Sequence, residues 1–216
     1  MATDMSLIFD NVGDVLEAYS DVTLPKWEDL PDIPLYMDQV IGLMERYLDI
    51  GGKVAENALE KDAKILTSSM VNNYVKMGIM PAPVKKKYDK EHLAYLLMIC
   101  ILKQSLSISV IGVFIQTQVD SMGVEAFYKL FIKYYKEFFD QYVNELIEIH
   151  KKIFHSDTIT DSQQAVMGIV AAACANAGKL TVDTADVIIN NVKEEDKKAK
   201  EKEKEKAEKD KKKLPK

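Results

Sequence analysis

The residues best suited to chemistry in this sequence are three consecutive lysines, Lys85, Lys86 and Lys87, which follow a turn rich in proline. They belong to residues 63–103, which carry a net charge of +5, whereas the whole chain carries −5. Ammonium groups gathered on a basic segment are suited to bind phosphates, and this attraction dominates nonspecific affinity for nucleic acid. The ordinary alternative for such a lysine cluster is a solvated turn without a partner.

A short polar helix immediately before the lysines is predicted to supply further contacts. The hydroxyl of Thr67 can cap a helix over residues 68–77, and Gly78 is a typical residue to end it. Helical spacing turns an apolar stripe toward a core, namely Met70, Val71, Tyr74 and Val75. The same spacing leaves hydroxyl, amide and ammonium groups free to face outward, namely Ser68, Ser69, Asn72, Asn73 and Lys76.

The elements that must position these residues are also mainly helical. Asp89 and Ser107 are expected to cap two further helices, with a buried stripe at Leu93, Leu96, Leu97, Cys100 and Ile101 in the first and Ile108, Ile111 and Ile115 in the second. An apolar face from Met37 to Leu48 predicts an earlier helix, which Gly51 and Gly52 end. A charged connector follows at residues 53–64.

The first 33 residues are expected to form an acidic arm. Its prolines disfavour helix at the preceding residues, and only a short helix near Val12 to Tyr19 is predicted. Residues 1–62 carry a net charge of −10, so this part of the chain repels duplex DNA unless it faces away. Trp27, the single tryptophan, is expected to pin the arm to a core by burying its apolar ring.

The stretch from residue 65 to residue 112 resembles the DNA-binding domain of the MerR family of bacterial regulators, a winged variant of helix-turn-helix. Tyr74 followed four residues later by Gly78 matches the end of the family's recognition helix. The next matches are the hydrophobic and proline-containing turn at Ile79, Met80, Pro81 and Pro83 and the wing at Lys86 and Tyr88. The later helices match through the aliphatic residues Leu93, Leu96 and Ile99, and the end of the motif matches at Ser107, Ile108 and Ile111.

This resemblance implies contacts with double-stranded DNA from the recognition helix and the wing. The expected DNA-binding residues are Thr67, Ser68, Ser69, Asn72, Asn73, Tyr74, Lys76, Lys85, Lys86 and Lys87. The family usually has Arg-Tyr-Tyr at the end of its recognition helix, whereas this chain has Asn72, Asn73 and Tyr74, and its wing has lysine instead of arginine. The whole chain also looks like a bacterial family of unknown function that is described as carrying a MerR-like domain.

The strongest periodic signal lies in the distal half, where aromatic and aliphatic residues recur at helical spacing from Val124 to Phe154. About 31 residues without glycine or proline predict a helix about 46 Å long. In MerR-like proteins a long helix at this place pairs with its twofold mate, so the resemblance implies a homodimer through residues 124–154. The alternatives are packing on the chain's own later helices and an aromatic-lined cavity for a small ligand beside residues 127–142.

The C-terminal part is predicted to contain two helices and a charged tail. The first runs from Ser162 to Ala177 and is capped by Gly178, and Thr181 opens the second. Its expected buried residues are Val182, Ala185, Ile188, Ile189 and Val192. The tail from Lys193 is interpreted as a solvated helix or a disordered segment, and a nonspecific electrostatic arm for DNA is the alternative.

Several functional classes find no support in the sequence. Gly52 and Lys53 lack the spacing of a phosphate loop, and no nucleophile elbow, catalytic triad order or dinucleotide fingerprint is present, so we expect no enzyme and no cofactor. His150 and His155 with Glu145 and Glu148 do not have the spacing of a bundle metal site, so no metal is expected. Cys100 and Cys174 are expected to be buried thiols.

No membrane partner is expected either. The longest apolar run is about half the length of a membrane span, and the acidic start does not resemble a signal peptide. A cytoplasmic location is the default expectation.

These observations predict an all-α fold: a MerR-like winged helix-turn-helix followed by a long helix and a helical C-terminal bundle. The expected divisions are the arm at 1–33, the helix-turn-helix domain at 34–118, a C-terminal or dimerisation domain at 119–192 and the charged tail at 193–216. The expected function is that of a DNA-binding transcriptional regulator. The competing expectation is a protein-interaction module that keeps this fold without binding DNA.

Overall fold

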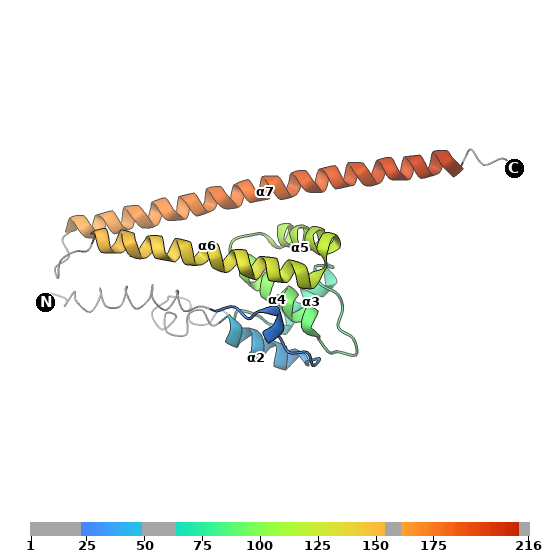
Figure 1. Cartoon of the computed structure of the whole chain (residues 1–216), viewed down its shortest axis with the longest axis horizontal. Helices are drawn as coiled ribbons and strands as arrows, with labels where there is room; N and C mark the ends of the chain where they lie inside the picture. Colours follow the sequence, from blue (N-terminus) through green and yellow to red (C-terminus); the bar gives the residue numbers. More distant parts are fainter. Residues whose placement is uncertain (1–22, 49–63, 154–160, 212–216) are drawn as a thin grey trace.

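The computed structural model describes residues 23–48, 64–153 and 161–211 (Figure 1). The short helix expected near Val12 to Tyr19, the end of the first long helix at Gly51 and Gly52, and most of the charged connector lie outside these residues. The described elements are η1 (Trp27–Asp29), α2 (Met37–Tyr47), α3 (Ser68–Lys76), α4 (Lys90–Leu102), α5 (Ile108–Met122), α6 (Val124–Ile153) and α7 (Asp161–Lys211). The prediction of an all-α fold is confirmed, since extended pairing within the described ranges is limited to two isolated bridges.

Side-chain caps explain where three of these helices begin. The hydroxyl of Thr67, the carboxylate of Asp89 and the hydroxyl of Ser107 each accept a hydrogen bond from the backbone amide three residues on, at 3.2–3.4 Å. Each bond satisfies one of the amides that lack a partner in the first turn. Gly78 follows α3 with φ of +71°, a conformation that suits glycine at the end of a helix. The predicted starts of α3, α4 and α5 are therefore confirmed.

The core is built around α4, in which every residue from His92 to Ile101 is buried. This helix packs against α2 on one side and α6 on the other. The core continues into the arm at Leu24 and Leu30 and into the first turns of α6 at Phe127 and Tyr128. Trp27 packs against this core, as predicted.

The expected division between residues 118 and 119 lies within a segment that contributes to one buried core on both sides. It falls inside α5, and both the arm and the start of α6 pack on the core that contains α4. The apolar stripe of α6 continues without interruption along the helix, which suggested that the helix belonged to a separate domain. The first third of that stripe instead completes the core built by the earlier helices.

Beyond this core, α6 and α7 form a long antiparallel hairpin, and α7 projects past the other helices (Figure 1). The predicted break at Gly178 is wrong, because α7 runs without interruption from Asp161 to Lys211. The Thr181 hydroxyl does not cap a new helix but donates to the carbonyl of Ala177 at 3.0 Å, one turn earlier in the same helix. A glycine inside a helix costs only about 1 kcal/mol, which the packing of α7 on α5 and α6 can offset. The expected charged tail is helical as far as Lys211.

Two positions that were expected to be buried are exposed. Met70 is 36% exposed at the start of α3, and Ile188 is 58% exposed on α7. The neighbouring Ile189 is half-buried, so the two adjacent isoleucines of α7 differ in exposure. Cys174 is also only half-buried, whereas Cys100 is buried as expected.

Candidate nucleic-acid interface

The three lysines form a tight two-residue turn, which we call the lysine turn (residues 84–87). Val84 and Lys87 exchange two backbone hydrogen bonds, at 3.1 and 3.0 Å, which leaves Lys85 and Lys86 as the central residues. Their φ angles are +50° and +62°. Positive φ at both central residues defines the type I′ turn, for which asparagine and glycine are the preferred residues. A non-glycine residue in this region costs about 1–2 kcal/mol, so backbone preference does not explain why lysine occupies both positions.

The base of the lysine turn is fixed on the core. Tyr88 is buried, and its backbone N–H and C=O each pair with Leu35 at 2.8 Å. The residues next to this pair also make contact, since the ammonium of Lys87 lies 5.2 Å from the ring centroid of Tyr36. Lys85, Lys86 and Lys87 are all exposed. The structure therefore presents three cations at the surface from an anchored base.

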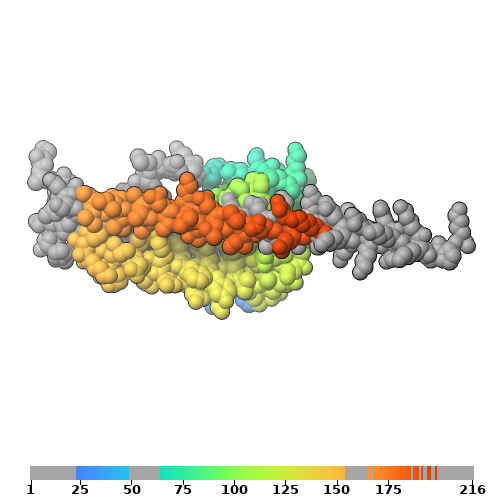
Figure 2. All heavy atoms as spheres, turned by 90° about the horizontal axis from the view of Figure 1, so that it is seen from above, coloured from blue at the N-terminus to red at the C-terminus, as the bar shows by residue number. Residues whose placement is uncertain are grey.

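Helix α3 places its polar residues on a second exposed surface. Val71 and Tyr74 are buried toward the core. The exposed residues of the helix include Ser68, Ser69, Asn72, Asn73 and Lys76. Figure 2 shows this part of the chain (turquoise) along the edge of the molecule opposite α6 (yellow), where α7 does not cover it. The hydroxyl, amide and ammonium groups of α3 are therefore accessible.

Two of the ten expected site residues have structural roles instead. Tyr74 is only 5% exposed, and burial raises the pKa of its hydroxyl, so its ring is part of the core and does not face a partner. Thr67 is half-buried, and its hydroxyl accepts the capping bond from the amide of Met70. The resemblance placed Tyr74 among the DNA contacts, but the period of α3 turns its ring into the core. The eight other expected residues are exposed.

The two surfaces are joined by a short segment that is held in the core. Ile79 and Met80, between α3 and the lysine turn, are both buried. Within the described residues, no hydrogen bond or ion pair links a side chain of α3 to Lys85, Lys86 or Lys87. The two surfaces are thus neighbours through the backbone rather than parts of one hydrogen-bonded cluster.

Sequence reasoning missed a further cation beside α3. The ammonium of Lys103, at the end of α4, donates to the carbonyl of Ile65 and lies 3.9 Å from the sulfur of Met70. At the other end of α3, the side-chain amide of Gln116 donates to the carbonyl of Gly78. Both hydrogen bonds join residues 38 positions apart, so no local pattern predicts them. They fix both ends of α3 against α4 and α5.

Other kinds of site find no geometry in the part of the chain that the structure describes. No three His, Cys, Asp or Glu side chains in these ranges come together as metal ligands. His155, which was considered as a metal ligand, and Gly52 with Lys53, which were considered as a phosphate loop, lie outside the described residues. No described helix combines the length and the apolar character that crossing a bilayer requires.

Comparison with known proteins adds one result to this geometry. The model of the family described as Domain of unknown function (DUF1836) matches residues 25–142. Comparisons with curated proteins and with solved structures gave no match. The matched range begins in the arm and ends in the second half of α6, so it contains α2 to α5, the lysine turn and most of the buried core. The chain therefore belongs to the DUF1836 family.

Proposed function

We propose that this protein is a DNA-binding transcriptional regulator of MerR-like type, in which α3 is the recognition helix and the lysine turn is the wing. The observation that carries the proposal is the pair Lys85 and Lys86 at positive φ. Strained backbone persists where the surrounding structure holds it and where function benefits from it. Two lysines at the tip of an anchored turn place cations where phosphates of a duplex can reach them.

The chemistry of the exposed residues supports different roles for the two surfaces, with phosphate contacts from the lysine turn and base contacts from α3. Lysines on the turn neutralise phosphates as point charges and carry no sequence information. On α3, Asn72 and Asn73 can donate and accept hydrogen bonds, and asparagine pairs with the adenine edge in the major groove. The lysine turn thus supplies affinity, and α3 supplies any discrimination among sequences.

Binding of duplex DNA by charge has a measurable signature. Fluorescence anisotropy with a pool of genomic fragments at low salt should show binding that weakens as salt rises, with a log-log slope of about −0.9 for each phosphate contacted. Replacing Lys85, Lys86 and Lys87 together by glutamate should abolish the binding and leave the thermal melt nearly unchanged. The matched control replaces the exposed Lys133, Lys151 and Lys179 by glutamate, which changes the net charge equally on α6 and α7. Wild-type protein without salt-sensitive binding, or equal loss in the control, contradicts the proposal.

We further propose that the regulator is a homodimer through α6. Leu130, Tyr134, Phe138 and Tyr142 recur every four residues on this helix and are 43–63% exposed, although α7 covers another side. They line an open apolar groove of about 510 Å³. An aromatic stripe of this size favours a partner surface, and a second copy offers the same stripe in an isologous contact.

Two measurements test the dimer. Sedimentation equilibrium should give twice the chain mass for wild type and one chain mass for Phe138→Glu, with the exposed Glu145→Gln as control. Selection of bound sequences from random duplex DNA should enrich an inverted repeat, because a twofold protein reads two half-sites. A wild-type monomer, or a single unrepeated site, argues against the α6 dimer.

The second candidate function is a protein-interaction module on the same fold. The exposed aromatic groove on α6 and the net charge of −10 on residues 1–62 favour it. Affinity purification after nuclease treatment separates the two functions, because a direct protein partner survives the treatment and a partner bridged by DNA does not.

A further inference from the structure

Two exposed methionines lie at the two ends of α3. Met70 is in the first turn of the helix and is 36% exposed, and Met77 follows its last residue and is 45% exposed. Among the residues whose side chains the structure describes, the only other exposed methionine is Met122 at the end of α5, at 40%. An exposed thioether is open to oxidants, which convert it to a polar sulfoxide that reductases can convert back.

The sulfur of Met77 has a hydrogen-bond donor beside it. The side-chain amide of Asn73 donates to this sulfur, with 3.4 Å between nitrogen and sulfur. The two residues are four positions apart, so their side chains are neighbours along the helix. Because a thioether sulfur is only a weak acceptor, this contact leaves the exposed amide of Asn73 able to donate to another partner.

Oxidation of Met77 replaces this weak acceptor by a strong one. The sulfoxide oxygen carries a partial negative charge and is bonded directly to the sulfur that already contacts Asn73. A small rotation of the Met77 side chain brings the oxygen to about 2.7–3.2 Å from the amide nitrogen, which is the normal hydrogen-bond distance. The amide of Asn73 is then held against the helix by its neighbour.

We propose that Met77 is a site of reversible oxidation by a hydroperoxide, and that its sulfoxide captures the side-chain amide of Asn73 and removes this group from the exposed surface of α3. Asn73 is one of the two asparagines to which base contacts are assigned above, so the captured state should bind DNA more weakly. This last effect rests on the proposed function of α3, whereas the oxidation and the capture of Asn73 do not.

The chemical step needs the sulfur and the peroxide alone. A lone pair on the Sδ atom of Met77 attacks one oxygen of hydrogen peroxide, and the S–O bond forms as the O–O bond breaks. The departing hydroxide takes the proton of the transferred hydroxyl group and leaves as water. The sulfur thereby loses two electrons, the peroxide gains two, and reduction by a methionine sulfoxide reductase restores the thioether.

The other two exposed methionines provide comparisons within the same chain. The sulfur of Met70 lies 3.9 Å from the ammonium of Lys103, which is on α4 and outside both proposed DNA-binding surfaces. At the sulfur of Met122, no donor lies within hydrogen-bond distance among the described residues. Oxidation of either residue should therefore leave the side chain of Asn73 unchanged.

Nuclear magnetic resonance of the full chain tests the capture directly. The side-chain NH₂ signals of Asn73 are assigned by their absence from the ¹H–¹⁵N spectrum of Asn73→Asp. Limited treatment with hydrogen peroxide, with oxidised positions identified by peptide mass spectrometry, should shift these signals in wild type and in the variant Met70→Leu with Met122→Leu. The signals should not shift in Met77→Leu. Leucine conserves the volume of methionine and all three positions are exposed, so the fold is retained.

DNA binding by the same samples tests the consequence. Affinity for duplex DNA should fall roughly tenfold when Met77 is oxidised, should return after treatment with the reductase, and should not respond to peroxide in Met77→Leu. Unchanged Asn73 signals after oxidation of Met77 overturn the capture. Equal affinity of reduced and oxidised wild type overturns the regulation alone, whereas reduced protein that binds no DNA overturns the proposed function and the regulation with it.

Discussion

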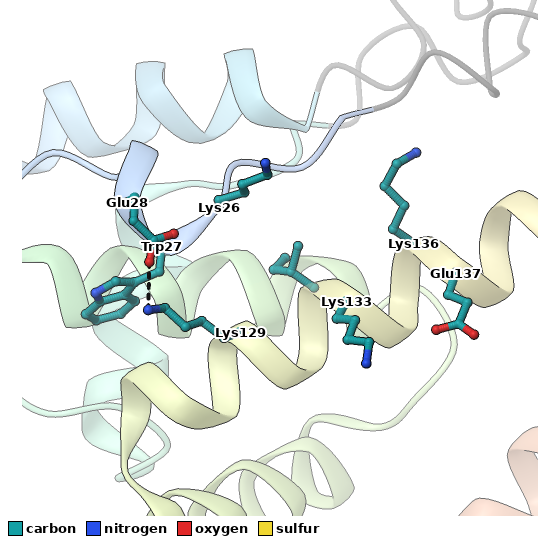
Figure 3. A pocket seen from close by; sticks show the side chains of 8 residues that line it. Lys26, Trp27, Glu28, Lys129, Lys133, Lys136 and Glu137 are labelled. Carbon is teal, nitrogen blue, oxygen red and sulfur yellow. Dashed lines mark ion pairs between the residues drawn. The ribbon is translucent and has the colours of Figure 1, made fainter.

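The hydroxyl of Tyr128 on α6 donates a hydrogen bond to the backbone carbonyl of Pro25, 103 positions earlier in the chain, at 2.7 Å. Both groups are buried, and burial raises the pKa of this tyrosine far above its usual value, so the hydroxyl remains a donor at every physiological pH. The neighbouring pair Glu28 and Lys129 joins the same two segments at the surface (Figure 3). This one buried bond therefore fixes the arm on α6.

Tyr128→Phe should lower the free energy of unfolding by about 1–2 kcal/mol, because the buried carbonyl of Pro25 loses its donor while the ring volume is kept. Urea unfolding checks the value, and the emission of Trp27 should shift to longer wavelength as the arm loosens. Tyr36→Phe, at a tyrosine that is 52% exposed, is the control and should change neither quantity. A variant as stable as wild type would show that the bond adds nothing to the attachment of the arm.

The same substitution at two glycines should have effects of opposite sign. A Cβ at Gly78 would meet only the side-chain amide of Gln116, at 4.0 Å, so Gly78→Ala isolates the cost of φ at +71°, which is about 1 kcal/mol. Gly42 lies inside α2 with no atom within 4 Å of an added Cβ, so Gly42→Ala should stabilise by about 0.5–1 kcal/mol through helix propensity. Thermal melts of the two variants against wild type measure both. Destabilisation at both sites would mean that side-chain packing, and not backbone conformation, determines the effect of alanine on stability at these two glycines.

Asp89 should make the stability of the fold depend on acid. Partial burial raises the pKa of this carboxyl, but hydrogen bonds from the side chain and backbone of His92 outweigh that effect, and the pKa lies below its ordinary value. The folded state then binds fewer protons than the unfolded state, so this stabilisation is present above about pH 4 and is lost as pH falls through the lower folded pKa.

Asp89→Asn separates the charge from the cap, since asparagine also caps helices well. The difference in melting temperature between wild type and Asp89→Asn should be largest near neutral pH and should shrink as the pH falls below about 4 and through the lowered folded pKa of Asp89. Melts at several pH values check this. A difference that stays constant with pH contradicts the assignment to the pair of Asp89 with the Nδ1 atom of His92, which lies 2.6 Å from the carboxylate.

The sequence predicted the local features that depend on a residue and its near neighbours. Thr67, Asp89 and Ser107 cap their helices because capping is an interaction over three residues, and Gly78 stops α3 for an equally local reason. The helix end predicted at Gly178 is wrong, because a glycine ends a helix only if the residues after it adopt a non-helical backbone conformation. Here Thr181 bonds back to the preceding turn, and packing on α5 and α6 keeps the helix continuous.

Features of the candidate sites that depend on distant residues were not predictable in this way. Lys103 reaches the carbonyl of Ile65, before α3, across 38 positions of the chain, and Tyr128 reaches the carbonyl of Pro25 across 103 positions. The exposed residues of α3 followed from its period, but the burial of Tyr74 shows that a residue type matched to a family motif is not necessarily at the surface. The positive φ angles of Lys85 and Lys86 had no sequence signal, because lysine is not a residue that predicts a type I′ turn.

The lysine turn should therefore gain stability when its lysines are replaced by the residues its backbone prefers. Lys85→Asn with Lys86→Gly relieves two unfavourable φ angles and should stabilise the fold by about 1–2 kcal/mol, seen as a rise of a few degrees in the melting temperature. The same change removes two cations, so affinity for duplex DNA should fall and the log-log salt slope should decrease by about 0.9 for each phosphate that the turn no longer neutralises. Lys85→Gln with Lys86→Gln is the matched control: it removes the same charges without relieving the backbone, and it should weaken DNA binding equally with little change in the melt. Only in the Asn-Gly variant should stability rise while DNA affinity falls. If the two variants have the same melting temperature and the same DNA affinity, the strained turn is not maintained for its charges.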